Sequence, residues 1–460
     1  MKYSMVFAAA AATTVSAGNT GQCNEEGGNF FCTAVKALQY DGLNVAGTYK
    51  AVTSMTQDGG CTFADVPFSG PIAPFDEDLS IHLRGPATIQ KLAVYTPKAN
   101  SKRDAPAPHS KRHGHQHLHK KFQHEHSHEE RAVGDTVHAK INGQDVSWTN
   151  TWDGKGAASP EVAAPVAAPA AQAAADVDVA ASKFVKSEKI ASAPNAGSSG
   201  SSYPQASPKK TDTSSVPAGD YARIGYYDAL SGQADGITFL GNYGGDGSGV
   251  WDKTWGNSLS YLSEDGTKGA ASPTVLKNGL IPDATEIAIF SDKPCTDKDA
   301  TCGYYRPGTV AYQGFKGADK VFTFRLTMPD NGETGWNKNM PACWLLNGKI
   351  PRTGQYNDCS CWKSGCGEFD VIEVLASGDT KCKSTFHYTN SIGNSDYIKR
   401  PTLGFANYAV IFSKAHSSAS VKVLPDDFEH SVALTSDQVE AMIADDAKNP
   451  GSVSKMAIPV

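Results

Sequence analysis

A ten-residue stretch around position 370 constrains this chain more than any other segment. It runs Cys366-Gly-Glu-Phe-Asp-Val-Ile-Glu-Val-Leu375 and sets three carboxylates among strand-forming residues. Side chains alternate between the two faces of a strand, so Glu368 and Asp370 share one face. Glu373 joins them only if a β-bulge near Val371-Ile372 adds one residue to the strand. The segment therefore predicts a bulged strand with three acids in a row on one face.

Such a row of like charges is typical of an active site, because neighbouring carboxylates push each other's pKa apart. Retaining glycoside hydrolysis needs one ionised carboxylate as nucleophile and one protonated acid about 5 Å away. The alternative is a solvated edge strand whose acids face water. The apolar residues between the acids imply that the opposite face is covered, which favours an active site.

The motif Glu368-Phe-Asp-Val-Ile-Glu373 resembles the bulged signature Glu-x-Asp-x-x-Glu of glycoside hydrolase family 16. Residues 320–329 and 340–346 look like the two strands that precede the catalytic strand in that family. In family 16 the catalytic strand lies mid-chain, whereas here it falls late, and the early segment 79–97 looks like the strand that closes the sandwich. This order resembles the circularly permuted 1,3-β-glucanase family of fungal cell-wall proteins.

The resemblance implies an all-β fold, a concanavalin-like jelly-roll β-sandwich that is circularly permuted, with long disordered linkers and a short C-terminal helix. It implies endo-acting, retaining cleavage of β-1,3-glucan in cell-wall organisation. No cofactor is expected, and the sequence has no Asp-rich loop with the spacing of calcium ligands, so no metal site is assigned. Glu368 would be the nucleophile, Glu373 the acid/base and Asp370 an assisting residue. Two alternatives remain open: a wall-remodelling transglycosylase that uses the same carboxylates, and a non-catalytic glucan-binding wall protein.

Aromatic residues are the candidates for substrate binding, since sugars offer apolar C–H faces to aromatic rings. His387 lies where family 16 carries a cleft histidine; it would contact sugar or orient a carboxylate, and a structural role is the alternative. Trp344 is expected in the core. The candidate set is Trp251, Trp255, Trp336, Trp362 and His387.

The chain of 460 residues divides by composition into folded and linking segments. Residues 1–17 are expected to be a signal peptide, with a small-residue cleavage site. Short strand-like runs separated by turns indicate β-structure in 18–100, a hairpin within 132–158 and the catalytic domain at 218–460. A helix is predicted at 436–448, where Thr435 and Gln438 are spaced as a capping box. Residues 101–131, rich in His, Lys and Arg, and 159–217, rich in Ala, Pro and Ser, are expected to be disordered linkers.

The His-rich tract offers two further hypotheses. Eight of the 13 histidines fall between His109 and His128, and imidazole binds zinc and copper. A disordered spacer is favoured, because nothing apolar nearby would fix a metal geometry. The dibasic pairs Lys102-Arg103 and Lys111-Arg112 are either processing sites or ordinary linker charge.

The ten cysteines in a chain with a signal peptide indicate disulfides. Three precede the linkers and seven follow them. Because both numbers are odd, at least one bridge joins the two ends if every cysteine pairs within the chain. The alternative is a free or intermolecular thiol.

Net charge and hydropathy indicate which partners and which cellular location to expect. The net charge of −6 gives no nucleic-acid signal, and no apolar run beyond the signal peptide is long enough for a membrane helix. We expect a secreted, extracellular monomer of the cell wall whose partner is β-1,3-glucan.

Overall fold

The computed structural model describes residues 23–26, 28–99, 136–141, 144–149, 212–296, 301–389, 391–443 and 451–458. The predicted signal peptide, the His-rich tract and most of the second linker lie outside these residues. The chain divides into two units. The smaller unit contains an antiparallel hairpin of β8 (Thr136–Ile141) and β9 (Gln144–Thr149). The larger unit carries everything described below.

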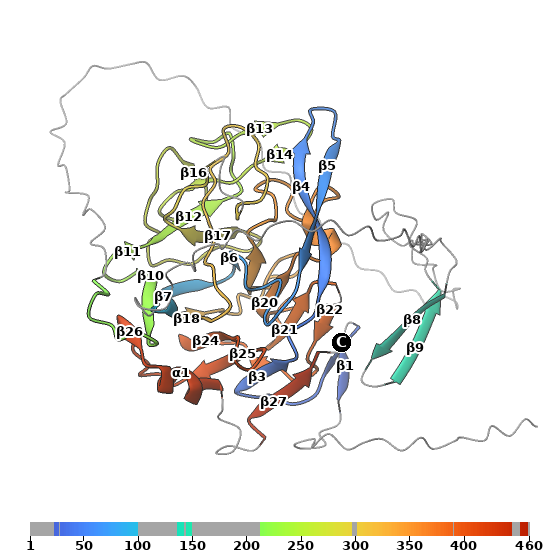
Figure 1. The fold of residues 1–460 in the computed structure, drawn as a ribbon, viewed down its shortest axis with the longest axis vertical. Helices are drawn as coiled ribbons and strands as arrows, with labels where there is room; N and C mark the ends of the chain where they lie inside the picture. Colours follow the sequence, from blue (N-terminus) through green and yellow to red (C-terminus); the bar gives the residue numbers. More distant parts are fainter. Residues whose placement is uncertain are drawn as a thin grey trace, which may run out of the picture. The chain divides into compact units, whose positions relative to one another are not determined.

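Two large sheets make up the larger unit (Figure 1). The first sheet has nine strands, and β26 (Ala433–Leu434) pairs with β10 beside the main path. Its strands in spatial order are β11 (Gln233–Asp235), β10 (Tyr221–Asp228), β7 (Thr88–Pro97), β18 (Lys320–Thr327), β24 (Ala406–Ser413), β25 (Ser418–Leu424), β3 (Ala37–Asp41) and β27 (Val453–Ala457).

The second sheet has ten strands, and β23 (Ile398–Lys399) pairs with β21 beside the main path. Its strands in spatial order are β16 (Gly269–Ala270), β15 (Ser260–Leu262), β12 (Ile237–Gly241), β17 (Glu286–Ser291), β6 (Leu79–Arg84), β19 (Ala342–Asn347), β20 (Glu368–Glu373), β21 (Lys381–His387) and β22 (Ser391–Gly393).

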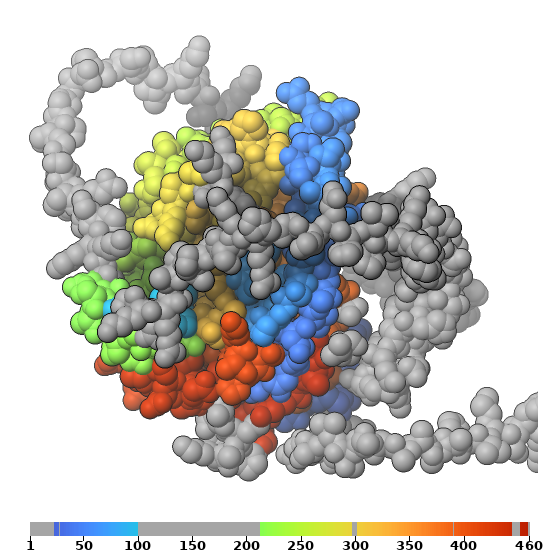
Figure 2. Space-filling model, viewed as in Figure 1, coloured from blue at the N-terminus to red at the C-terminus, as the bar shows by residue number. Residues whose placement is uncertain are grey.

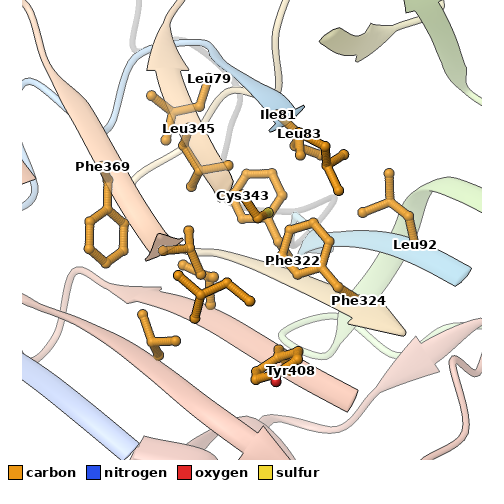
Figure 3. Packing of buried hydrophobic residues seen from close by; sticks show 14 of the residues in the cluster. Leu79, Ile81, Leu83, Leu92, Phe322, Phe324, Cys343, Leu345, Phe369 and Tyr408 are labelled. Atoms are coloured by element: carbon orange, nitrogen blue, oxygen red, sulfur yellow. The ribbon is translucent and has the colours of Figure 1, made fainter. Parts of the chain in front are cut away.

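The main hydrophobic core lies between the two sheets (Figure 3). Leu79, Ile81 and Leu83 contribute from β6 with no exposed surface, as their period-2 spacing predicts. Phe322 and Phe324 face them from β18 of the other sheet. Alternate residues of the first sheet form a second cluster on its other face, together with the helix. Two packed sheets around one core confirm the predicted all-β sandwich.

N-terminal strands lie inside both sheets rather than beside them. β6 pairs with β17 on one side and β19 on the other, and β7 pairs with β10 and β18. Figure 2 shows the N-terminal segment in blue packed against yellow and red parts of the C-terminal half. Residues 28–99 therefore complete the sandwich and do not form a core of their own.

Three further hairpins flank the sheets: β1 (Asn24–Glu26) with β2 (Asn29–Phe31), β4 (Gly47–Met55) with β5 (Cys61–Phe68), and β13 (Trp251–Asp252) with β14 (Gly256–Asn257). The tip of the β4–β5 hairpin is tied to the C-terminal half by the disulfide Cys61–Cys359. Trp255 adds a hydrogen bond from its Nε1 to the carbonyl of Thr56, 2.8 Å long. A bridge between the two ends of the chain was expected from the cysteine parity, and it exists.

The other cysteines pair locally or stay free. Cys23–Cys32, Cys295–Cys302 and Cys361–Cys366 are bridged, whereas Cys343 and Cys382 are buried free thiols. The condition that every cysteine pairs is therefore not met. Both free thiols lie after the linkers, so three paired cysteines precede the linkers and five follow them, and both numbers are still odd.

The described part of the chain contains one α-helix, α1 (Ser436–Ile443). Its capping box is formed as predicted: the Thr435 amide donates to Gln438 Oε1 at 2.8 Å, and the Gln438 amide donates to Thr435 Oγ1 at 3.1 Å. No helix among the described residues is long and apolar enough to span a membrane.

The end of the second predicted linker is ordered. Residues 212–217 pack beside Lys98, whose ammonium group donates to three of their carbonyls, at 2.6 Å from Ser214 and Val216 and 3.1 Å from Thr213. A cation with three backbone acceptors fixes a segment that has few apolar residues of its own.

Candidate active site

The strand β20 contains the predicted bulge. In its pairing with β19, Cys343 lies opposite Ile372 and Trp344 lies opposite Asp370, so Val371 has no partner of its own. The pairing with β21 shifts at the same place. Val371 and Ile372 are both buried in the core between the sheets. The extra residue returns Glu373 to the face of Glu368 and Asp370.

This face of the second sheet points away from the main core. Its other residues on β19 are Ala342, Trp344 and Leu346, which form a separate apolar cluster with the β4–β5 hairpin. Glu368 and Asp370 are each 6% exposed, and the Glu373 side chain is 21% exposed. The acids are therefore not a solvated edge: β20 lies between two strands, and two of its carboxylates are almost buried.

Glu368 accepts a hydrogen bond at each carboxylate oxygen. The Tyr356 hydroxyl donates to Oε1 at 2.8 Å, and the Trp362 Nε1 donates to Oε2. The two donor rings meet edge to face, with centroids 5.3 Å apart. Two donors fix both the position and the rotation of the carboxylate, and they favour its ionised form.

A cysteine-rich loop holds these donors in place. Trp362 lies in a single 3-10 turn, η1 (Cys361–Ser364), whose N-cap Ser360 accepts from the Trp362 amide. The disulfide Cys361–Cys366 closes the turn. Gly365 ends the turn at φ +86°, a conformation that favours glycine. The loop is thus short and cross-linked, which limits the motion of the indole next to Glu368.

Asp370 lies between the two glutamates and contacts His387. Its Oδ2 is 3.0 Å from His387 Nε2, while His387 Nδ1 is 2.8 Å from the Ser391 hydroxyl. The structure thus places His387 where it orients a carboxylate. The imidazole is 30% exposed, so it also has access to solvent.

Burial raises the pKa of both inner carboxyls. For Glu368, burial and then the charge of Asp370 raise the pKa to about 8, while His387 and the two donors oppose the rise. For Asp370, burial and then the charge of Glu373 raise the pKa well above the usual range, and Arg84 opposes it. Carboxyl groups that titrate above their usual range are typical of acid–base and nucleophilic chemistry.

Glu373 has a different partner. Arg84 Nη2 donates to Glu373 Oε1 at 3.0 Å, and its Nη1 lies 4.0 Å from Glu286 Oε1 at the same face. One carboxylate held by neutral donors and one held by a cation are unequal environments. The two glutamates therefore lie in different electrostatic environments.

The four candidate tryptophans do not gather at the carboxylates. Only Trp362 contacts one of them. Trp251 is 61% exposed and lines an open hollow of about 560 Å³ with Asp246, Asn257 and three glycines, and Trp336 is 86% exposed. Trp255 is tied to the β4–β5 hairpin, and Trp344 is 4% exposed, as expected for a core residue.

Sequence reasoning missed Arg84 and Tyr356, which contact the acids, and Glu286, which lies beside Arg84. Arg84 could have been placed from the sequence. Leu79, Ile81 and Leu83 share one face by their period-2 spacing, and alternation puts Arg84 on the opposite face. Glu286 and Tyr356 could not have been placed in this way, since their contacts depend on which strands and loops become neighbours. Among the described residues no group of three or more His, Cys, Asp or Glu side chains is placed to hold a metal ion.

Comparison with known proteins identifies the family of the chain. The family model "Cell wall protein YJL171C/Tos1, C-terminal" matches residues 219–442, and its N-terminal counterpart matches residues 36–97. No solved structure matches the chain significantly.

Full-length relatives are found in several fungi. A protein of Arthroderma benhamiae named "Probable circularly permuted 1,3-beta-glucanase" is 40% identical over 97% of this chain and 98% of its own length. Two proteins named "Probable circularly permuted 1,3-beta-glucanase TOS1" are each 36% identical to this chain. The Candida albicans protein matches over 99% of this chain and 99% of its own length. The Saccharomyces cerevisiae protein matches over 92% of this chain and 93% of its own length. The chain therefore belongs to the Tos1/YJL171C family of cell wall proteins, whose relatives carry the name of probable circularly permuted 1,3-beta-glucanases.

Proposed function

We propose that this protein is a secreted cell-wall hydrolase that cleaves β-1,3-glucan internally with retention of anomeric configuration. The observation that carries the proposal is the bulged strand β20, which brings Glu368, Asp370 and Glu373 to one face with Glu368 fixed by two donors. The names of the full-length relatives support β-1,3-glucan as the substrate.

Glu368 is the nucleophile in this mechanism and Glu373 is the acid/base. A Glu368 oxygen attacks the anomeric carbon while Glu373 gives its proton to the departing glycosidic oxygen, which leaves a glycosyl ester on Glu368. A water molecule then attacks the same carbon, Glu373 takes its proton, and Glu368 is released as a carboxylate. Two displacements at one carbon retain the configuration.

Asp370 supports this exchange from between the two glutamates. When Glu368 becomes an ester it loses its charge, and the electrostatic cost of a carboxylate at Asp370 falls with it. His387 keeps the Asp370 carboxyl oriented through both steps, because it contacts the Oδ2 atom at 3.0 Å. Asp370 thus buffers the charge that moves through the site.

The exposed tryptophans serve as platforms for the polymer chain. Trp251 has the stronger case, since its indole borders a hollow of about 560 Å³ that also presents Asp246 and Asn257. An apolar ring next to a few polar groups is the usual composition of a sugar site. Trp336, at 86% exposed, is the second candidate.

Extracellular location fits the four disulfides of the described residues, since such bridges persist in oxidising compartments. We propose that the protein works in the wall as a monomer.

The test compares the wild type with Glu368→Gln on laminari-oligosaccharides, with product lengths measured by chromatography. Shorter products from the wild type alone support hydrolysis, and longer products indicate that transfer to sugar dominates. Glu264→Gln is the matched control, because Glu264 is exposed and pairs with Lys277 at the surface. If the wild type and Glu368→Gln are equally inert while both bind glucan, the protein is a binding protein and the proposal fails.

A further inference from the structure

A row of residues crosses five neighbouring strands at the level of Glu373. In register these are Glu286 on β17, Arg84 on β6, Ala342 on β19, Glu373 on β20 and Lys383 on β21. All project from the face that carries the three acids, because their neighbours along each strand lie in the main core. The row therefore places a cation two strands away from the proposed acid/base.

Arg84 is held so that its outer nitrogens face two carboxylates. Its Nε donates to the carbonyl of Met340 at 2.8 Å, which fixes the guanidinium plane. Nη2 then lies 3.0 Å from Glu373 Oε1 and Nη1 lies 4.0 Å from Glu286 Oε1. The Arg84 side chain is 12% exposed, so this charge is little screened by water.

The small side chain between them makes the contact possible. β6 and β20 are separated by β19, so Arg84 must reach across about 10 Å of sheet. Ala342 occupies the crossing point and is 1% exposed. A methyl group there leaves room for the guanidinium, whose central carbon also lies 6.0 Å from the Trp344 ring.

We propose that Arg84 is a positioning residue that holds Glu373 for proton transfer, and that Glu286 shares the charge of Arg84 so that Glu373 can still carry a proton. The inference rests on the proposed function. When Glu373 gives its proton to the leaving oxygen it becomes a carboxylate, and Arg84 is already placed to bind that carboxylate. The ion pair is thus stronger after proton transfer than before it, which is what lowers a barrier.

Without Glu286, Arg84 would have Glu373 as its only carboxylate on this row. The whole charge of Arg84 would then act on Glu373. Glu286 is 39% exposed and shares the cation at 4.0 Å, and burial raises its pKa against the effect of Arg84. Glu286 is therefore placed to weaken the ion pair between Arg84 and Glu373.

Other ionisable groups also face Glu373. Asp370 is its neighbour along β20 and repels a second negative charge. Lys383 is its cross-strand neighbour, but its ammonium is directed to the carbonyls of Phe30 and Asn394, and burial lowers its pKa to about 8. Burial raises the pKa of the Cys382 thiol, on the core side of β21, and the charge of Glu373 adds to the rise. Arg84 is thus the cation in direct contact with Glu373.

The experiment uses the full-length protein and two substrates that differ in leaving group. A laminari-oligosaccharide needs proton donation to its leaving oxygen, whereas a 2,4-dinitrophenyl β-laminaribioside does not. Arg84→Met should lower kcat/KM on the oligosaccharide about 10- to 100-fold, less than the roughly 10²- to 10⁴-fold contribution of general acid catalysis because Glu373 itself remains. The rate on the dinitrophenyl substrate should stay within about threefold. Arg84→Lys should recover part of the lost rate.

The pH profile supplies the readout that a merely structural role would not move. Arg84→Met should shift the alkaline limb of kcat/KM to higher pH, because Glu373 keeps its proton longer without the cation. Glu286→Gln should shift the same limb to lower pH, because Arg84 then acts on Glu373 undivided. The Glu286 side chain is 39% exposed, so Glu286→Gln is expected to fold. This variant still tests the inference if Arg84→Met does not fold.

Two outcomes overturn the inference. Equal losses on both substrates for Arg84→Met, or limbs that do not move in opposite directions, show that Arg84 and Glu286 only support the fold. Both results require an active wild type, so they leave the proposed function standing. A wild type inert on both substrates would overturn the proposed function and this inference together.

Discussion

Replacing Tyr356 with phenylalanine removes one of the two donors to Glu368 and leaves the aromatic ring in place. The lost hydrogen bond is 2.8 Å long and ends on a carboxylate that is 6% exposed. A hydrogen bond to a charged group contributes about 1.5–3 kcal/mol, which corresponds to about 1–2 pKa units. Because the donor favours the ionised form, its loss raises the pKa of Glu368, already raised to about 8 by burial.

The assay is the pH dependence of kcat/KM on a laminari-oligosaccharide. The nucleophile must be ionised, so activity falls as the pH drops through the pKa of Glu368, above the ordinary glutamate range. Tyr356→Phe should move this acid limb upward by about 1–2 pH units. Tyr261→Phe is the matched control, since its hydroxyl contacts Tyr312 at 3.0 Å and no acid of the site. An acid limb that stays in place would refute the assignment of Glu368 as the ionised nucleophile.

Two further predictions concern stability. Replacing Cys61 and Cys359 with serine removes a disulfide that spans 298 residues. The free energy of unfolding measured in urea should fall by up to about 5 kcal/mol. An unchanged value would show that other contacts hold the hairpin. Burial lowers the pKa of His82 to about 3 and of His430 to about 4. The unfolded chain therefore binds protons more tightly than the folded protein, and the free energy of unfolding should fall as the pH drops below about 6.5. The loss should be about 2 kcal/mol per histidine at pH 5. His430→Gln should remove about half of the combined loss in unfolding free energy that the two histidines cause between pH 7 and pH 5. An identical pH dependence in the variant would contradict the burial argument.

Local pattern was enough to predict the central strand. The offset between Glu368 and Glu373 is five residues, and a strand that buries Phe369 can present both acids only with one inserted residue. The structure has the inserted residue at Val371. The helix at Ser436 followed from its capping box for the same reason: both signals are contained within a few neighbouring residues.

Contacts between distant segments could not be predicted in this way. Arg84 and Glu373 lie 289 positions apart, and their contact depends on β6 lying beside β19, with Ala342 between them. Cysteine parity predicted a bridge between the two halves only if every cysteine paired, and it could not assign the bridge to Cys61. Periodicity specifies which face a side chain occupies, whereas the order of strands in a sheet specifies what that face meets.

The central claim is that Glu368 forms a covalent bond to the sugar while Glu373 transfers the proton. A laminaribiosyl fluoride carrying fluorine at C2 of the reacting sugar slows both displacements and lets the glycosyl-enzyme accumulate, and mass spectrometry of the digested protein then locates the sugar. The account predicts one added disaccharide, on the peptide that contains Glu368 and on that side chain. A label on Glu373, or cleavage of glucan with inversion and no label on either residue, would contradict it.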